Sequence, residues 1–246
     1  MARIGVVSEQ GMRGRMEDSH AVQFDLFQSG DIFGGVYDGH AGSYAAIYAS
    51  QVLHLHFAEA LREGLAPEEA FARSYREVSR ELEEQSSGAT AVTFYLRQSW
   101  VIAANAGDTR AIIVDSRDVR QLTRDHRVED PQERERVESS GGTILGSYVM
   151  RGGEGLMPTR TLGDPFFEEV GVIPDPEVHA EELRQADQWL VVACDGLFDV
   201  LDNEEVAEVV RKAGDAQEAA DALGREALMN RMGMDNLTAI VVDLRR

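Results

Sequence analysis

The stretch FGGVYDGHAG, residues 33–42, joins an apolar run to three residues that can carry chemistry. The run ending at Tyr37 predicts a buried strand, because it is short, apolar and followed by turn residues. We expect Asp38, Gly39 and His40 at the tip of a turn, where a carboxylate, a backbone carbonyl and an imidazole would form a candidate site. Taken alone, Asp-Gly is more typical of an ordinary turn and His40 of a helix start, so the site depends on partners elsewhere in the chain.

Hydrophobic periodicity predicts the elements on both sides of this stretch. Helices are expected over residues 44–62, 67–85, 130–140, 203–212 and 215–232, and strands over residues 3–8, 21–26, 88–97, 99–107, 109–115, 117–123, 188–194 and 236–244. The first two helices are amphipathic, so we expect them to cover one face of a sheet.

The strands between residues 88 and 123 are joined by short polar connections, which predict an antiparallel meander. In such a meander Gly107 and Asp108 form a hairpin turn between neighbouring strands. Residues 143–187 are rich in glycine and proline, so we expect an irregular flap there and no second core. No repeat or linker interrupts the chain, and a single domain over residues 1–246 is the simplest prediction.

Composition excludes several classes of function. The chain has 246 residues, 43% of them hydrophobic, and a formal net charge of −20. This charge repels nucleic acids and anionic membranes, so neither is an expected partner. Lys212 is the only lysine, which leaves none for a Walker loop or for the strand lysine of a kinase.

Cysteine usage and hydropathy indicate the compartment. Cys194 is the only cysteine and cannot form an internal disulfide, and the N-terminal residues lack the apolar segment of a secretory signal. No apolar run approaches the roughly 20 residues of a membrane helix. We therefore expect a cytoplasmic protein, and we expect a monomer. Cys194 follows an apolar run and lacks the CxxxxxR pattern of cysteine phosphatases, so we expect a small core residue there.

Acidic residues recur at the ends of predicted strands. Glu17 and Asp18 begin a strand, Asp38 ends one, Asp108 lies in a turn, Asp195 ends an apolar strand and Asp235 begins the last one. Each aspartate by itself is a common turn or cap residue. Gathered on one rim of a sandwich, however, these carboxylates would repel one another unless they bound divalent cations. Mg²⁺ or Mn²⁺ fits better than Zn²⁺, because no cage of cysteine or histidine accompanies them.

Eight motifs in order resemble the type 2C family of metal-dependent serine/threonine protein phosphatases: RMEDSH, VYDGHAG, GATAV, ANAGDTRAI, LTRDH, TRTLGD, VVACDGLFDV and DNLTAIVV. The match extends from Arg13 to Val242. This resemblance implies an α+β fold, a four-layer αββα sandwich in which two central antiparallel sheets are flanked by helices. It also implies a centre of two Mn²⁺ or Mg²⁺ ions on one rim of the sandwich.

The resemblance further implies roles for the acidic residues. Asp38 matches the carboxylate that bridges both ions, and the carbonyl of Gly39 matches a ligand of one ion. Asp195 and Asp235 match ligands of the other ion. Glu17 matches a position that binds an ion directly or through water.

Four more residues receive roles in the same way. Asp18 matches a metal-site position that acts from behind the direct ligands, and Asp108 matches a position linked to a third, weaker ion. Arg13 matches the arginine that holds the substrate phosphate, and His40 matches the proposed general acid.

By this resemblance the chain hydrolyses phosphoserine and phosphothreonine in proteins, through direct attack of a water that bridges two metal ions. Two alternatives stay open, a catalytically weak or inactive member that acts as a regulatory binding module and a metal-dependent hydrolase of nucleotides or nucleic acids. Residues 156–164, LMPTRTLGD, depart from the LAVSRALGD that is common in the family. Pro158 is expected to alter the backbone pairing there, next to the substrate groove.

Overall fold

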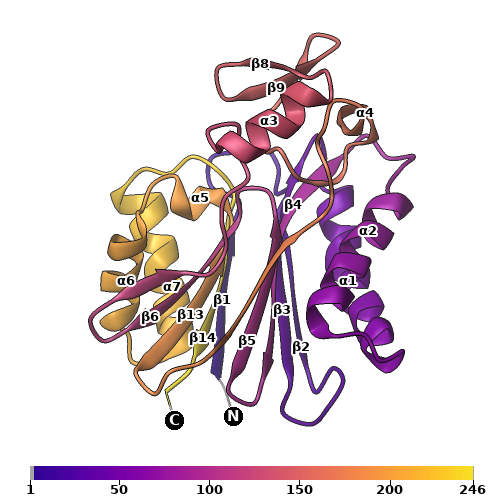
Figure 1. Ribbon diagram of the computed structural model, residues 1–246. Helices are drawn as coiled ribbons and strands as arrows, with labels where there is room; N and C mark the ends of the chain where they lie inside the picture. The colour runs from indigo at the N-terminus through magenta and orange to yellow at the C-terminus, as the bar shows by residue number, and fades with distance from the viewer. Residues whose placement is uncertain (1–2, 246) are drawn as a thin grey trace.

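The computed structural model describes residues 3–245 and contains two antiparallel sheets packed face to face (Figure 1). Helices α1 (Tyr44–Arg62) and α2 (Pro67–Glu81) cover one outer face, and α6 (Asn203–Arg211) and α7 (Ala216–Arg225) cover the other. The predicted αββα sandwich is therefore confirmed. The single domain predicted for residues 1–246 includes Met1, Ala2 and Arg246, which lie outside the described residues.

Hydrogen bonding defines the strand order in the described chain. One sheet has the order β1 (Arg3–Glu9), β14 (Leu237–Asp243), β13 (Asp187–Ala193), β6 (Arg110–Asp115) and β7 (Val119–Gln121). The other has the order β12 (Glu177–Glu182), β5 (Trp100–Ala106), β4 (Gly88–Arg97), β3 (Ile32–His40) and β2 (Ser19–Phe24), with β11 (Leu162–Gly163) beside β4. The shorter helices are α3 (Pro131–Ser139), α4 (Pro165–Glu168) and α5 (Asp195–Phe198), and a π-helical turn, η1 (Glu226–Asn230), follows α7.

Three apolar layers hold the sandwich together. Val36 and Ile240 are fully buried between the two sheets. Phe57 and Phe71 stack between a sheet and helices α1 and α2, with ring centroids 4.2 Å apart. Trp189 is fully buried on the other side, beneath α6 and α7. Burial of each such side chain stabilises the fold by about 1.5–3 kcal/mol, so the layers fix both sheets and hold their rims in place.

The connection at Gly107 and Asp108 differs from the prediction. Strands β5 and β6 belong to different sheets, so these residues form a crossover and the predicted hairpin turn is wrong. Gly107 has a φ of +110°, and a Cβ there would lie 2.4 Å from the side chain of Thr90, so the crossover requires glycine. The predicted meander divides into two hairpins, one in each sheet. This division places Asp108 on the rim that both sheets share.

Asp38, Gly39 and His40 also differ from their predicted position. They belong to β3 itself, where they pair with residues 88–90 of β4, and the predicted turn starts only after them. The turn residues 41 and 42 have φ values of +56° and +124°. The apolar pattern ends at Tyr37 and could not show that strand pairing continues beyond it. The three site residues are therefore held by the hydrogen bonds of the sheet.

Residues 143–187 contain more regular structure than predicted. Strands β8 (Thr143–Leu145), β9 (Tyr148–Arg151) and β10 (Glu154–Leu156) form a small sheet near α3, at the top of Figure 1. Val128, Val137, Val149, Leu156, Phe167 and Val172 form a separate apolar cluster, so the prediction of no second core is wrong. Strands this short show no clear alternation of apolar and polar residues, which explains the error. Strand β12 lies in a main sheet, and Pro158 forms only an isolated bridge, with Arg127.

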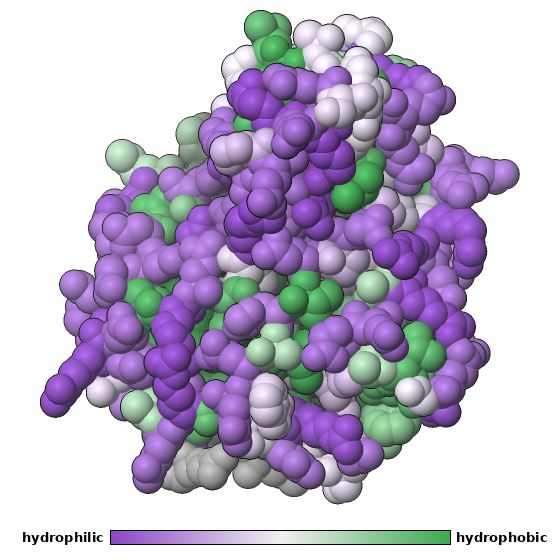
Figure 2. Space-filling model, in the orientation of Figure 1, coloured by the Kyte–Doolittle hydropathy of each residue, from purple (hydrophilic) through white to green (hydrophobic). Residues whose placement is uncertain are grey.

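The surface is mostly polar. Figure 2 shows hydrophilic residues over most of one face, with hydrophobic residues in small separate areas. Within residues 3–245, no helix has the length and apolar character needed to cross a membrane.

Candidate metal centre

The predicted site residues come together at one rim of the sandwich, in a pocket of about 300 Å³. Arg13, Glu17, Asp38, Gly39, His40, Asp108, Asp195 and Asp235 line this pocket, and residues 155–158 close it from the side of the small sheet. Asp18 is buried outside the lining. A larger hollow of about 1120 Å³ lies among the hairpin turns at the other end of the sheets, and none of the predicted site residues lines it.

The carboxylates of the pocket raise one another's pKa. Burial and the carboxylate of Asp195 raise the pKa of Asp38 well above its usual value. Burial and the carboxylate of Asp108 likewise raise the pKa of Asp195 to about 7. These groups can be ionised together only at a cost in folding free energy, because like charges in a partly buried site repel. A bound cation would remove that cost.

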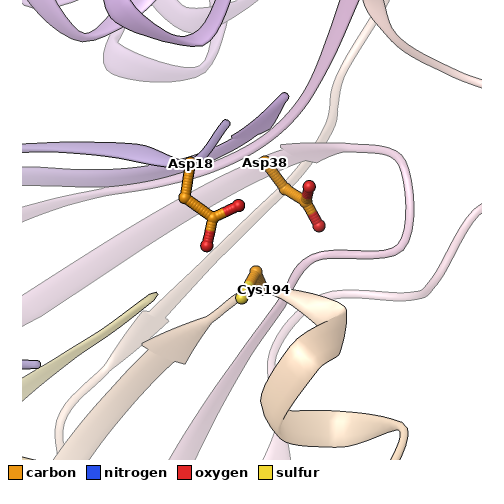
Figure 3. A group of neighbouring side chains, drawn as sticks. All are labelled: Asp18, Asp38 and Cys194. Atoms are coloured by element: carbon orange, nitrogen blue, oxygen red, sulfur yellow. The ribbon is translucent and has the colours of Figure 1, made fainter. Parts of the chain in front are cut away.

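The environment of the Asp18 carboxylate indicates whether a cation fits this site (Figure 3). Its side chain is only 7% exposed, and neither carboxylate oxygen has a hydrogen-bond partner within residues 3–245. Burial raises the pKa of Asp18 to about 6. A buried carboxylate without a partner is costly unless it is protonated or lies near a cation. The lining carboxylates offer oxygen donors, so the residues present fit hard divalent cations such as Mg²⁺ and Mn²⁺.

Gly39 allows two chain segments to approach closely. A Cβ on Gly39 would lie 2.4 Å from the carbonyl oxygen of Glu17, so any side chain there would displace that segment. Packing therefore requires glycine at this position. The close approach brings Glu17 into the same pocket as Asp38.

Asn236 fastens the loop that carries Arg13. Nη2 of Arg13 donates to Oδ2 of Asp235 at 2.6 Å. The side-chain amide of Asn236 donates to the carbonyls of Gln10 and Arg15, at 2.7 and 3.0 Å, and its oxygen accepts the backbone N–H of Glu17 at 2.7 Å. The sequence interpretation missed Asn236, since its only signal is its place directly after Asp235.

His40 has a partner that the sequence interpretation also missed. Its Nε2 lies 2.7 Å from Oδ2 of Asp164, which is 8% exposed. Burial lowers the pKa of His40, but the Asp164 carboxylate more than offsets this, so the pKa lies above its usual value. Asp164 is the last residue of the motif TRTLGD, which gave no sign of a contact with His40.

Arg127 supplies a positive charge beside the acidic pocket. Its Nε donates to Oδ2 of Asp108 at 2.7 Å, and its Nη2 donates to Oδ1 of Asp199 at 3.0 Å. The same Nη2 lies 3.6 Å from Oδ2 of Asp195. Arg127 therefore pairs with the carboxylate to which the resemblance assigns a third ion. No sequence signal singled it out from the other arginines.

Cys194 is a fully buried residue of the core between the sheets, which confirms the prediction. Burial, followed by the charge of Asp18, raises the pKa of its thiol well above the usual value. A protonated thiol is a poor nucleophile, so Cys194 is not suited to attack a substrate.

Fold and pocket together define a class of protein. Two antiparallel sheets are flanked by helices, and carboxylates and an arginine gather on one rim, which is the arrangement that the sequence resemblance implies. The chain belongs to the protein phosphatase 2C family, whose sequence model matches residues 2–236.

Individual relatives agree with this assignment. The probable protein phosphatase 2C 45 of Oryza sativa subsp. japonica is 35% identical over 245 residues, which cover 97% of this chain and 86% of the relative. The probable protein phosphatase 2C 71 of Arabidopsis thaliana is 33% identical, and the match covers 97% of this chain but only 54% of the relative. This chain therefore spans about half the length of that Arabidopsis relative.

Solved structures show the same fold. The crystal structure of serine-threonine phosphatase 2C from Toxoplasma gondii has a TM-score of 0.88 and 21% identity, covering 98% of this chain and 94% of that one. The serine/threonine phosphatase Stp1 from Staphylococcus aureus has a TM-score of 0.74 and 21% identity, covering 100% and 96%.

Proposed function

We propose that this chain hydrolyses phosphoserine and phosphothreonine in proteins, with two Mn²⁺ or Mg²⁺ ions as cofactors. Membership of the protein phosphatase 2C family supports the reaction class. The observation that carries the proposal is the pocket in which Arg13 lies among the carboxylates of Asp38, Asp195 and Asp235. A guanidinium fork suits phosphoryl oxygens, and carboxylates suit divalent cations.

Each acidic residue has a part in holding the ions. Asp38 would hold both ions, the carbonyl of Gly39 would bind one of them, and Asp195 and Asp235 would bind the other. When bound, the ions neutralise charge on the phosphoryl oxygens and supply an activated water as the nucleophile.

Glu17 would bind an ion directly or through a water molecule. Asp18 would stabilise the centre without binding an ion directly. A third, weaker ion at Asp108 requires Arg127 to move, since Arg127 already pairs with that carboxylate.

Arg13 and His40 act on the substrate. Arg13 is 60% exposed, so its guanidinium can leave Asp235 and bind two phosphate oxygens. Because Nε2 of His40 pairs with Asp164, Nδ1 is the ring nitrogen that remains to protonate the departing serine or threonine oxygen. General acid catalysis of this kind contributes about 10² to 10⁴ in rate.

We also propose the compartment, the oligomeric state and the substrate class of the enzyme. The single buried cysteine supports a cytoplasmic protein, and we propose that it acts as a monomer on phosphoproteins. The net charge of −20 argues against nucleic acid as a substrate.

Turnover of p-nitrophenyl phosphate and of a phosphothreonine peptide, with Mn²⁺ and then with a chelator, tests the proposal. We expect metal-dependent activity that Asp38→Asn abolishes. Asp175→Asn is the matched control, because Asp175 is a surface carboxylate that pairs with exposed Arg76 and does not line the pocket. Metal binding without turnover would instead support a regulatory binding module, and preference for a phosphodiester would support a nucleotide hydrolase.

A further inference from the structure

Exposed methionines lie in two loops beside the candidate metal centre. Met12 follows β1 and is 75% exposed, whereas Met232 and Met234 lie between η1 and β14 and are 78% and 65% exposed. These loops adjoin the upper ends of β1 and β14 in Figure 1, at the end of the sandwich that also carries the small sheet. Methionine is common on surfaces that bind other proteins, because its flexible thioether adapts to different apolar partners.

The backbone holds two of these methionines side by side. The N–H of Met12 donates to the carbonyl of Met234 at 3.1 Å. The next residue in each loop belongs to the pair of Arg13 and Asp235, which lie 2.6 Å apart. A Cβ on Gly11 would lie 2.1 Å from the carbonyl oxygen of Asp235, so the two loops are in direct contact. Met12 and Met234 are thus fixed next to the arginine of the pocket.

Neither Met12 nor Met234 supports the core. Within residues 3–245, the buried apolar clusters and the side chains packed against them include neither of the two. Exposed side chains away from such clusters contribute little to folding, so stability does not explain an apolar pair at this place. Substitutions at these positions are therefore expected to leave the fold intact.

A substrate bound through its phosphate comes within reach of the pair. Arg13 lines the pocket and is the proposed contact for the phosphate, and Met12 is its direct neighbour in the chain. An extended substrate advances about 3.3 to 3.6 Å per residue, so the residues on both sides of the phosphorylated one stay near the mouth of the pocket. Since the side chain of methionine is nearly as long as that of arginine, Met12 and Met234 can contact a residue next to the phosphorylated one.

The chemistry of methionine decides which neighbouring residue gains from this contact. A thioether is uncharged and accepts hydrogen bonds only weakly, so it offers little to a polar side chain. An aliphatic or aromatic side chain placed against it removes apolar surface from water on both partners, which favours binding.

We propose that Met12 and Met234 contact the substrate residue next to the phosphoserine or phosphothreonine, so that the enzyme prefers sites with a large apolar neighbour such as leucine. The occupant of this surface is a segment of the phosphoprotein substrate, because the pair is continuous with the pocket that receives the phosphate. This inference rests on the proposed phosphatase function and adds residues that determine its specificity.

Matched phosphothreonine peptides test the preference. One peptide carries leucine directly before the phosphothreonine, another carries leucine directly after it, and each has a partner with asparagine, which has nearly the same shape, at that position. With Mn²⁺ we expect leucine on at least one side to raise kcat/KM about fivefold or more over asparagine. Equal kcat/KM values for leucine and asparagine on both sides would overturn the proposal.

Variants of the pair locate the contact. The readout is the ratio of kcat/KM for the leucine and asparagine peptides, in which any general change in activity cancels. Met12→Gln and Met234→Gln should each lower this ratio about threefold or more, whereas Met12→Leu keeps an apolar contact and should retain the preference. Leu55→Gln is the control, because Leu55 is exposed on α1 and does not line the pocket. Parental ratios in both glutamine variants, or an equal fall in Leu55→Gln, would contradict the assignment.

Two further measurements separate the other outcomes. Turnover of p-nitrophenyl phosphate with no peptide preference would contradict this inference alone. Absence of that turnover would contradict the proposed function, and calorimetry with the same peptides would then decide whether a binding module still selects leucine through the pair. Sedimentation tests the remaining occupant, a second copy of the chain. A dimer that Met12→Gln dissociates, with an unchanged peptide ratio, would overturn the proposal.

Discussion

Nε2 of His40 lies 2.7 Å from Oδ2 of Asp164, although 124 positions separate the two residues in the chain. Asp164 has a φ of +56°, a left-handed conformation that aspartate adopts more readily than most residues. It directly precedes α4, so the small apolar cluster that includes Phe167 holds it in place. Asp164, directly before α4, thus supplies a carboxylate that orients the ring of His40, the proposed general acid.

Asp164→Asn should impair catalysis while keeping the shape of this contact. The pKa of His40 falls in the variant, because the contact that does most to offset burial is lost, and the alkaline limb of kcat moves to lower pH. For a phosphothreonine peptide we expect kcat to fall about tenfold or more, within the range of general acid catalysis. The rate with p-nitrophenyl phosphate should change little, since its leaving group needs no proton. Profiles of kcat against pH, with Asp175→Asn as control, check this, and equal losses on both substrates would argue against the acid role.

Asp38→Asn should stabilise the metal-free protein. The raised pKa of Asp38 means that its ionisation opposes folding, so metal-free stability falls as pH rises from about 4 through the raised pKa. The asparagine of the variant does not ionise, so this part of the pH dependence of metal-free stability disappears.

Mn²⁺ at about 100 times its Kd should stabilise the parent by about 2.7 kcal/mol and the Asp38→Asn variant much less. Thermal unfolding with chelator and with Mn²⁺ measures both effects. An equal gain from Mn²⁺ in the two proteins would contradict the bridging role.

Motifs predicted the acidic residues that line the pocket because most of them lie next to a strand with a strong local pattern. Asp38 and Asp195 each end an apolar run and precede a glycine, so the sequence marks them clearly. Asp164 and Asn236 act through contacts that depend on the folded chain, such as the bond from Asn236 to Arg15 across 221 positions. No local pattern carries that information.

The same limit applies to the fold. The sequence predicted the strands on both sides of Gly107 correctly, but a hairpin and a crossover between sheets use the same glycine and aspartate. Only the packing of β5 and β6 into different sheets decides between them. Turn residues therefore predict where the chain changes direction, and the core decides which strands then pair.

Glu133 should be important for stability. It is 1% exposed and pairs with Arg136 at 2.6 Å and Arg160 at 2.7 Å. Burial acts to raise the pKa of Glu133, but these arginines hold that pKa well below its usual value. Glu133→Gln leaves two guanidinium groups with a neutral partner and should cost about 3 to 5 kcal/mol at neutral pH.

Acidification should reduce the difference in the free energy of unfolding between the parent and Glu133→Gln. The contribution of Glu133 is complete above the usual glutamate pKa and is lost as pH falls toward the lowered one. Urea unfolding from about pH 7 to about pH 3 measures this. Glu138→Gln on the same helix is the control, because its pair with Arg134 is exposed and worth about 1 kcal/mol or less. A loss that does not change with pH would show that charge is not the cause.

Arg127 should limit how many ions the pocket holds. Its guanidinium pairs with Asp108 at 2.7 Å and with Asp199 at 3.0 Å, so a third cation at Asp108 must displace a charge that the protein already supplies. Arg127→Gln removes this competitor and leaves the carboxylates in place. In the absence of metal the variant should be less stable than the parent, because the carboxylates lose their partner.

With excess Mn²⁺ we expect calorimetry to count two ions in the parent and three in Arg127→Gln, and the added ion should restore the stability that the metal-free variant lost. Arg134→Gln is the matched control, because Arg134 pairs with exposed Glu138 away from the pocket and should leave the count at two. Three ions in the parent would show that Arg127 does not compete for Asp108. Fewer ions in Arg127→Gln than in the parent would show that the arginine helps to build the centre, since a competitor can only lower the number of ions bound.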